Sequence, residues 1–591
     1  MSTRSWPGGP PSWHRSSTSS RPGTGNNPAT LRSHTIHYFV PCIRTTKEFA
    51  MTAQNTFQTV DAVVIGAGFG GIYAVHKLHN EQGLTVVGFD KADGPGGTWY
   101  WNRYPGALSD TESHVYRFSF DKGLLQDGTW KHTYITQPEI LEYLEDVVDR
   151  FDLRRHFRFG TEVKSATYLE DEGLWEVTTG GGAVYRAKYV INAVGLLSAI
   201  NFPNLPGIDT FEGETIHTAA WPQGKSLAGR RVGVIGTGST GQQVITALAP
   251  EVEHLTVFVR TPQYSVPVGK RPVTTQQIDE IKADYDNIWA QVKRSGVAFG
   301  FEESTVPAMS VTEEERRQVY EKAWEYGGGF RFMFETFSDI ATDEEANETA
   351  ASFIRNKIVE TIKDPETARK LTPTGLFARR PLCDDGYFQV FNRPNVEAVA
   401  IKENPIREVT AKGVVTEDGV LHELDVIVFA TGFDAVDGNY RRMEISGRDG
   451  VNINDHWDGQ PTSYLGVSTA KFPNWFMVLG PNGPFTNLPP SIETQVEWIS
   501  DTVAYAEENG IRAIEPTPEA EAEWTETCTQ IANMTVFTKV DSWIFGANVP
   551  GKKPSVLFYL GGLGNYRGVL DDVTANGYRG FELKSEAAVA A

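Results

Sequence analysis

The amino-acid sequence predicts an α/β protein with two Rossmann-like dinucleotide-binding domains and a helical insertion in the second of them. Three observations indicate this fold: a G-x-G-x-x-G motif from Gly66 to Gly71, a second one from Gly236 to Gly241, and a helix-forming stretch after the second motif. Each motif follows an apolar run of strand length and precedes a helical pattern, which is the context that gives it structural meaning. We therefore expect two largely parallel sheets, each with a nucleotide site at the carboxyl ends of its strands.

Composition excludes several classes of partner. The chain has 591 residues, too many for one hydrophobic core, and a net charge of −21, which argues against nucleic acid because phosphate binding needs a basic surface.

We find no run of about 18 apolar residues and expect no membrane span. The cysteines, Cys42, Cys383 and Cys528, are far apart in sequence, which predicts neither a disulfide framework nor a zinc site. We expect a cytoplasmic protein without metal, a monomer or a weak homo-oligomer.

Residues 1–50 differ from the rest of the chain. Their charged residues are six basic ones and a single acid, among many Ser, Pro, Gly and Thr: Arg4, Arg15, Arg21, Arg32, Arg44, Lys47 and Glu48. An Arg- and Ser-rich, acid-poor leader can be a transit peptide. Because Met51 lies shortly before the first predicted strand, we favour the interpretation that this segment is untranslated upstream sequence, with Met51 as the natural start. In both cases we expect this segment to be disordered.

The first glycine motif follows the apolar run 61–65. Its first glycine makes a tight turn, the second lets the backbone approach a pyrophosphate, and the third lets helix and strand pack. Asp90 ends the next predicted strand, 19 residues after Gly71. Its carboxylate can accept a hydrogen bond from a ribose hydroxyl and would repel a 2′-phosphate, so the site is predicted to hold FAD or NAD, and its N-terminal position favours FAD. An empty Rossmann fold is the alternative.

The stretch 96–110 contains four aromatic residues, three glycines and a proline. This composition predicts a loop and not a helix, suited to cover a planar ring system. Simple packing on a core is the alternative. Further on we expect a helix at 138–148, strands around 157–163, 175–178 and 189–195, and a proline-rich domain boundary at 200–207.

The second motif repeats the pattern of the first with one informative difference. Arg260 lies 19 residues after Gly241, at the position that Asp90 takes after Gly71. An arginine at the ribose position suits a 2′-phosphate, so the second site is predicted to prefer NADPH. A solvated strand-end cation is the alternative.

The insertion and the segments after it complete the predicted fold. Residues from about 270 to 365 show helical periodicity, interrupted by the glycines at 327–329. Arg379 and Arg380 precede a proline and are expected to be extended, so their side chains should point in opposite directions, one toward the NADP phosphate and one toward the flavin. After a buried strand at 425–434 we expect a strand at 475–480, a helix from Ser491, and a loop around Trp543 before a strand at 556–560.

These features divide the chain into six segments. Residues 1–50 are the extension, 51–200 and 437–591 the two parts of the FAD-binding domain, 201–265 and 384–436 the two parts of the NADP-binding domain, and 266–383 the mainly helical insertion.

Four patterns resemble those of the Baeyer–Villiger monooxygenases. The first is F-x-G-x-x-x-H-x-x-x-W-P, formed by Phe211, Gly213, His217, Trp221 and Pro222. The second is G-x-W-x-x-x-x-Y-P-G-x-x-x-D at 97–110, and the others are 380–384 and 542–548. The patterns look most like the cyclohexanone-oxidising branch of that family, and the resemblance covers essentially all of residues 56–583.

The resemblance implies a chemistry. It implies tightly bound FAD, NADPH as reductant, and conversion of a cyclic ketone and O2 to a lactone through a C4a-peroxyflavin and a Criegee intermediate. Arg380 matches the family's active-site arginine and would stabilise the anionic peroxide and the intermediate. Asp110 would orient Arg380. We doubt that His217 is a general base and expect a conformational or hydrogen-bonding role for the fingerprint, at the junction of the two domains.

The resemblance also assigns binding residues. The FAD set is Gly66, Gly68, Phe69, Gly71, Asp90, Thr98, Trp99, Tyr100, Trp101, Asp110, Tyr116, Val163 and Leu488. The NADP set is Gly236, Thr237, Gly238, Ser239, Thr240, Gly241, Gln242, Arg260, Thr261, Arg379 and Trp543. The ketone pocket is expected to contain Phe330, Phe485, Thr486, Leu488 and Phe558, which could equally be ordinary core residues. One departure is Arg379, where the family usually has lysine, so NADPH preference should survive with altered phosphate geometry.

Three other functions share parts of this layout. N- or S-oxidising flavin monooxygenases have the same two motifs, and Trp221-Pro222 with the Arg380/Asp110 pair favours ketone oxidation over them. Disulfide reductases need a C-x-x-C or C-x4-C pair, which this sequence lacks. The third alternative is a non-catalytic flavin-binding sensor. If it were correct, added ketone would not change the rate of NADPH oxidation.

Overall fold

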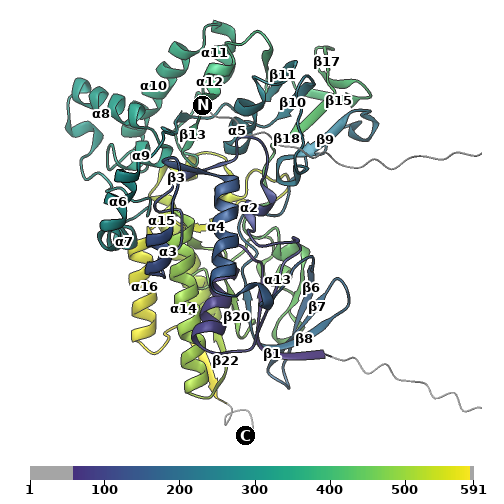
Figure 1. Cartoon of the computed structure of the whole chain (residues 1–591), viewed down its shortest axis with the longest axis vertical. Helices are drawn as coiled ribbons and strands as arrows, with labels where there is room; N and C mark the ends of the chain where they lie inside the picture. Colours follow the sequence, from purple (N-terminus) through teal and green to yellow (C-terminus); the bar gives the residue numbers. More distant parts are fainter. Residues whose placement is uncertain (1–56, 586–591) are drawn as a thin grey trace, which may run out of the picture. The chain divides into compact units, whose positions relative to one another are not determined.

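Two sheets, one for each glycine motif, organise residues 57–585, the part of the chain that the computed structural model describes (Figure 1). The prediction of a disordered extension at residues 1–50 lies outside this part. The described residues belong to one compact unit. Among them, no helix has both the length and the apolar character needed to cross a membrane.

The first sheet has eight strands and is built around β1 (Phe57–Ile65). β1 pairs in parallel with β2 (Val86–Phe89) and β8 (Val184–Asn192), and its buried half is the apolar run before the first motif. The other strands are β5 (Phe157–Arg158), β6 (Val163–Leu169), β7 (Leu174–Thr179), β19 (Glu444–Ser446) and β20 (Trp475–Met477). β20 pairs with β8 in parallel, so the C-terminal part of the chain returns to this sheet.

The second sheet has five strands, all parallel, in the order β14-β11-β10-β18-β9. They are β9 (Glu214–His217), β10 (Arg231–Ile235), β11 (His254–Val259), β14 (Val396–Ala400) and β18 (Val426–Phe429). β10 leads through the second motif into α5 (Ser239–Leu248), as β1 leads into α1 (Phe69–Val75) and the π-helical turn His76–Glu81. Purely parallel strands connected by helices are the expected Rossmann arrangement.

A two-stranded parallel ladder closes the helical insertion at its base. β12 (Ser265–Pro267) enters it and pairs with β13 (Leu382–Asp384), which leaves it. Between them lie α6 (Thr275–Ala283), α7 (Tyr285–Arg294), α8 (Glu313–Tyr326), α9 (Gly329–Phe334), α10 (Glu344–Thr361) and α11 (Pro365–Leu371). Figure 1 shows α8, α10 and α11 grouped together. Thr274 and Thr312 start α6 and α8 with capping boxes, which satisfy their first backbone N–H groups.

The remaining α-helices and strands complete the described part. They are α2 (Thr98–Trp101), β3 (Leu108–Glu112), α3 (Lys122–Asp127), β4 (Tyr134–Thr136), α4 (Gln137–Arg150), α12 (Tyr387–Val390), β15 (Ile406–Thr410), β16 (Gly413–Thr416), β17 (Leu421–Glu423), α13 (Ile453–Trp457), β21 (Gly483–Pro484), α14 (Leu488–Glu508), β22 (Ile511–Pro516), α15 (Pro518–Asn533), β23 (Phe558–Tyr559), α16 (Leu563–Ala575) and β24 (Phe581–Ser585).

Several local predictions were wrong in detail. The stretch 96–110 contains a helical turn, α2, which begins after Gly97 at a φ of +53°. α14 begins at Leu488, three residues before Ser491, because Pro489 and Pro490 fit a first helical turn, whose N–H groups need no partner. The break between α8 and α9 is only two glycines long, and α9 begins at Gly329. Each error arises from a glycine or proline that starts a helix.

The third glycine of each motif packs helix against strand, as predicted. A Cβ on Gly71 would lie 1.8 Å from the carbonyl oxygen of Gly66, and a Cβ on Gly241 would lie 2.3 Å from that of Gly236. No side chain fits at these distances. Both helices can therefore start close enough to their strands to leave their N-termini facing the same side as the strand ends.

We predict that Gly241→Ala lowers the free energy of unfolding by about 1–3 kcal/mol, the usual cost of overpacking. Gly238→Ala is the matched control, because a Cβ on Gly238 would meet nothing within 4 Å. Urea unfolding without NADPH, followed by tryptophan fluorescence, measures both. Equal stabilities of the two variants would contradict the packing role.

Candidate active site

A cavity of about 1460 Å³ connects the two glycine motifs. Its lining includes Ile65 and Ile235, the last residues of β1 and β10, so it lies at the carboxyl ends of the parallel strands of both sheets. Pockets for one small ligand usually measure about 300–1,000 Å³. The cavity therefore has room for more than one such ligand.

Most of the predicted site residues line this cavity. From the FAD set these are Gly66, Gly68, Phe69, Asp90, Thr98, Trp99, Trp101, Asp110, Tyr116, Val163 and Leu488. From the NADP set they are Gly236, Thr237, Gly238, Ser239, Thr240, Arg260, Thr261, Arg379 and Trp543. Arg380 and the whole ketone set, Phe330, Phe485, Thr486, Leu488 and Phe558, also line it.

Four predicted cofactor residues do not line the cavity. Gly71 and Gly241 serve the helix–strand contacts described above. The Tyr100 hydroxyl accepts a hydrogen bond from the backbone N–H of Asp93 at 3.3 Å, and Arg103 lies 4.5 Å from the Tyr100 ring centroid. Gln242 is fully buried, and its side-chain amide has no hydrogen-bond partner among residues 57–585.

The first motif forms a glycine cradle. Gly66 has a φ of +108°, and a Cβ on Gly97 would lie 2.8 Å from the Cα of Gly68, so the loop after β2 touches the motif directly. Asp90 accepts hydrogen bonds from the backbone N–H groups of Ala67 at 2.7 Å and Ala92 at 2.8 Å. Burial raises its pKa, against these two bonds. Asp90 thus ties the turn to the strand end as well as facing the cavity.

The second motif faces a group of cations. Arg260 and Arg379 line the cavity together with Lys402, a residue that sequence reasoning missed. Within residues 57–585 none of the three forms an ion pair with a carboxylate. Burial is the main cause that lowers the pKa of Arg379; the charge of Asp541 opposes it, and the charge of Arg260 adds to it. Arg379 still stays protonated, as arginines do. This cationic group, beside open space at Gly238, fits a phosphate-bearing dinucleotide.

Lys402 could not be recognised from its sequence position. It follows β14, which pairs in parallel with β11, the strand that ends beside Arg260. The two cations meet because the carboxyl ends of neighbouring parallel strands lie at the same edge. The pairing of β14 with β11 is a long-range contact across the whole insertion, and no local pattern signals it.

Arg380 pairs with Asp110 across 270 positions of sequence. Arg380 lies two residues before the start of β13, Asp110 lies in β3, and the Arg380 Nη2 donates to the Asp110 Oδ2. The neighbouring Arg379 points to a different partner and donates to the backbone carbonyl of Asp541 at 2.9 Å. The predicted divergence of the two arginine side chains is therefore seen.

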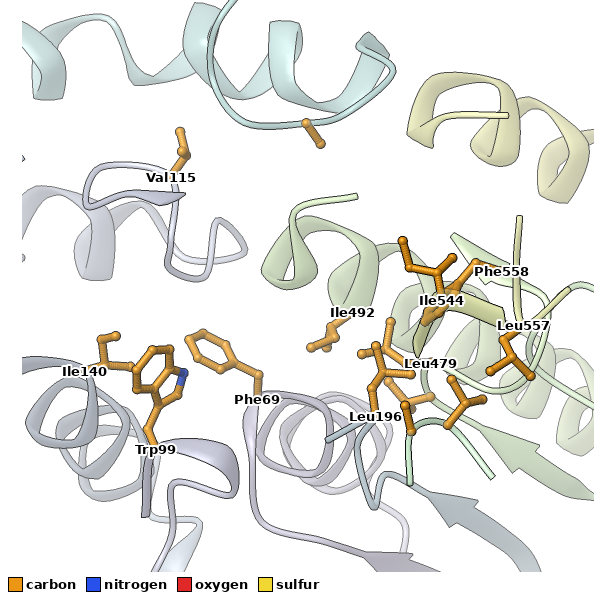
Figure 2. Packing of buried hydrophobic residues seen from close by; sticks show 14 of the residues in the cluster. Phe69, Trp99, Val115, Ile140, Leu196, Leu479, Ile492, Ile544, Leu557 and Phe558 are labelled. Atoms are coloured by element: carbon orange, nitrogen blue, oxygen red, sulfur yellow. The ribbon is translucent and has the colours of Figure 1, made fainter. Parts of the chain in front are cut away.

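An aromatic wall stands beside this ion pair. The Phe330 ring stacks on Phe299 at a centroid distance of 4.1 Å, and the Arg380 guanidinium lies 5.5 Å from the Phe330 centroid. Phe485 packs edge-on against Phe558 at 5.2 Å. Figure 2 shows that other apolar lining residues come from both ends of the chain, Phe69 and Trp99 from the first motif and its loop, and Leu479 and Ile492 from the C-terminal part. Phe299 was missed because it lies in an irregular segment between α7 and α8.

Comparison with known proteins identifies the family. The flavin-binding monooxygenase-like family model matches residues 60–267. A Baeyer-Villiger monooxygenase from Pseudooceanicola batsensis is 59% identical over 88% of this chain and 95% of its own length. The chain belongs to the Baeyer–Villiger monooxygenases.

Two further relatives refine this result. The crystal structure of cyclohexanone monooxygenase from Rhodococcus sp. Phi1 bound to NADP+ is 85% identical, with a TM-score of 0.89, over 90% of this chain and all of that one. Phenazine N-monooxygenase PhzNO1 from Lysobacter antibioticus is 55% identical over 89% of this chain and 97% of its own length. This Baeyer–Villiger monooxygenase is therefore an NADPH-dependent flavin monooxygenase, and the predicted α/β fold with two Rossmann-like domains is confirmed.

The fingerprint of this Baeyer–Villiger monooxygenase lies outside the cavity. Phe211, Gly213, His217, Trp221 and Pro222 are all absent from its lining. The buried His217 ends β9, at the edge of the second sheet, and its Nδ1 accepts from the backbone N–H of Ala219 at 3.1 Å. Its ring lies 5.1 Å from Phe202 and 6.1 Å from Phe433, both of which line the cavity.

The pKa of His217 makes stability depend on pH. Burial lowers this pKa from 6.5 to about 4, so the folded state prefers the neutral ring. The resulting stabilisation is fully present above the unfolded pKa and is lost as the pH falls from 6.5 toward 4. Between these two pH values the free energy of unfolding of His217→Asn is therefore expected to fall less steeply with decreasing pH than that of the wild type. The difference in slope should reach up to about 1.4 kcal/mol per pH unit.

Urea unfolding of both proteins between about pH 7 and about pH 5 measures this difference. Asparagine keeps an oxygen that can accept from the N–H of Ala219. Parallel stability profiles for the wild type and the variant would contradict a buried neutral histidine.

Proposed function

We propose that this chain converts cyclic ketones of the cyclohexanone type to lactones, with FAD, NADPH and O2. One observation carries the proposal: a fixed guanidinium, Arg380, held by Asp110 beside an aromatic wall in the cavity that the two dinucleotide motifs share. The 85% identical relative named cyclohexanone monooxygenase supports this substrate class. The cytoplasmic location and the monomeric or weakly oligomeric state stay predictions.

The two cofactors are assigned to the two motifs. FAD would occupy the first domain, proposed as residues 51–200 and 437–591, along the cradle of Gly66, Gly68 and Gly97. NADPH would occupy the second, proposed as 201–265 and 384–436. Arg260, Thr261 and Arg379 would hold the 2′-phosphate, and Trp543 would contact the nicotinamide ribose.

Arg380 supplies charge where the reaction needs it. A bound reduced flavin provides the activated oxygen for insertion next to a carbonyl. Addition of a nucleophilic oxygen to a ketone places negative charge on oxygen, which is costly in an apolar cavity unless a cation is already in place. Arg380 stays charged under all relevant conditions, and Asp110 fixes its orientation. Phe299, Phe330, Phe485 and Phe558 would exclude water and hold the ketone ring.

Heteroatom oxidation is the second candidate. The 55% identical phenazine N-monooxygenase matches this chain over 97% of its own length, so the fold alone does not choose between a ketone and an aromatic nitrogen. Product analysis with cyclohexanone and with phenazine separates the two. Lactone from cyclohexanone, together with ketone-stimulated NADPH oxidation, supports the proposal. If the enzyme forms an N-oxide from phenazine but no lactone, heteroatom oxidation replaces the proposed function.

We predict that Arg380→Ala lowers the rate of lactone formation by about 10²–10³-fold, the loss typical for one preorganised charge-stabilising group. Flavin reduction by NADPH should persist, because it does not require stabilised charge on oxygen. Stopped-flow absorbance follows the reduction, and gas chromatography follows the lactone. Full lactone formation by this variant would overturn the assigned role.

Arg260→Ala is expected to raise the KM for NADPH about 10- to 100-fold, the value of a charge-assisted hydrogen bond to phosphate. The KM for NADH should not change, because NADH has no 2′-phosphate. Steady-state kinetics of the wild type and the variant measure the KM values for NADPH and NADH. An equal increase for NADH would show that Arg260 acts on another part of the nucleotide.

A further inference from the structure

The strand that carries Asp110 carries a second acid on the same side. Asp110 and Glu112 lie two residues apart in β3, and their side chains line the same small cavity. Each pairs with an arginine from the insertion or its end. Arg380 pairs with Asp110, and the Arg331 Nη2 donates to the Glu112 Oε1 at 2.6 Å.

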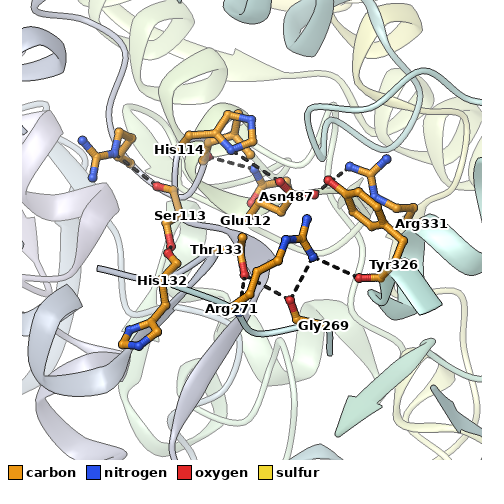
Figure 3. Close-up of polar contacts among 12 residues, drawn as sticks. Glu112, Ser113, His114, His132, Thr133, Gly269, Arg271, Tyr326, Arg331 and Asn487 are labelled. Atoms are coloured by element: carbon orange, nitrogen blue, oxygen red, sulfur yellow. Dashed lines mark hydrogen bonds and ion pairs between the residues drawn. The ribbon is translucent and has the colours of Figure 1, made fainter. Parts of the chain in front are cut away.

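The second pair is almost completely buried. The side chains of Arg331 and Glu112 are 12% and 13% exposed. The Arg331 guanidinium lies 4.9 Å from the Phe301 centroid and 4.4 Å from that of Tyr326. Figure 3 shows Arg331 facing Tyr326 and Glu112, with His114 on the far side of the acid, 3.6 Å from the Glu112 Oε2. Glu335, 40% exposed, accepts from the other end of the guanidinium.

Arg331 is also a neighbour of Asp110. A small cavity of about 10 Å³ is lined by Asp110, Glu112 and Arg331 together. A cavity of this size holds about one water molecule, and the Arg331 side chain lines it together with the carboxylate that orients Arg380. Asp110 therefore pairs with one arginine, Arg380, and shares a small cavity with a second, Arg331.

The backbone that carries Arg331 cannot withdraw. A Cβ on Gly329 would lie 2.7 Å from the carbonyl oxygen of Leu382, so α9 packs directly on the segment that follows Arg380. The N–H of Gly328 donates to the carbonyl of Pro267 in β12 at 2.8 Å. With its helix held in this way, Arg331 has only its side chain to move.

We propose that Glu112 is a positioning residue that engages Arg331 and thereby reserves Asp110 for Arg380. The inference rests on the proposed function, because it assigns Arg380 the stabilising charge. Arginine keeps its charge when buried and must find an acceptor. Without the Glu112 charge, the Arg331 guanidinium turns across the small cavity to Asp110, and Arg380 loses its fixed orientation.

Glu112→Gln tests this with an isosteric change. Lactone formation is expected to fall about 10- to 100-fold, the loss that follows from misplacing a catalytic group by about 1 Å. More NADPH should be consumed with release of hydrogen peroxide in place of lactone, while the rate of flavin reduction by NADPH stays unchanged. Glu335→Gln is the matched control, because it removes the exposed partner of Arg331 and keeps the Glu112 pair; it should behave as the wild type.

A double variant distinguishes positioning from a merely structural ion pair. Glu112→Gln/Arg331→Met lacks the competing guanidinium, so it should recover most of the lactone formation that Glu112→Gln loses. Methionine is long and apolar enough to keep the contacts with Phe301 and Tyr326. A double variant as slow as Glu112→Gln, or a Glu112→Gln enzyme with wild-type coupling, overturns the inference.

A crystal structure of the Glu112→Gln holoenzyme separates this inference from the proposed function. The Arg331 guanidinium is expected on Asp110, whichever substrate the enzyme oxidises. If Asp110 still pairs with Arg380 alone, the inference fails even where the wild type forms lactone. If the wild type forms no lactone but Arg331 moves to Asp110, the proposed function fails and the inference about the ion pairs stands.

Discussion

The Arg380–Asp110 ion pair is the contact on which the arrangement of the site depends. The Asp110 carboxylate stabilises the Arg380 guanidinium beside the aromatic wall, because the desolvation of an unpaired charge costs several kcal/mol. This ion pair joins β3, which follows the first motif, to the segment that carries Arg380, between α11 and β13. The β12–β13 ladder and the glycine contact of α9 then hold that segment in place. One ion pair thus links the part of the chain around the first motif to the part around the second.

The two sheets have the same glycine turn between strand and helix, but the charged side chains beside the turns have opposite signs. Each has a glycine turn with positive φ and a glycine whose missing side chain lets the helix start against the strand. At the strand end next to the first turn stands an acid, Asp90, and next to the second stand Arg260, Arg379 and Lys402. The backbone geometry therefore provides a general dinucleotide cradle, and a few charged side chains decide which ribose it suits.

The most recognisable stretch of the sequence takes no direct part in the site. Phe211–Pro222 lies at the edge of the second sheet, where its histidine is buried and neutral and contacts two rings, Phe202 and Phe433, that reach the cavity. Its position is consistent with a conformational role between the two domains. We assign the chemistry to residues with less conspicuous patterns, and the pair of Glu112 with Arg331 belongs to no motif.

Short-range patterns in the sequence were enough to predict the two glycine motifs with their flanking strands and helices, the helical insertion and, by family resemblance, the pairing of Arg380 with Asp110. These features depend on backbone requirements and periodicity that a few neighbouring residues express. Tertiary structure alone decided that Lys402 joins Arg260, that Phe299 stacks on Phe330, and that Arg331 stands beside Asp110. These contacts depend on which strands pair and on how closely α9 packs against the segment after Arg380. Such long-range packing is not encoded in any short stretch of the sequence.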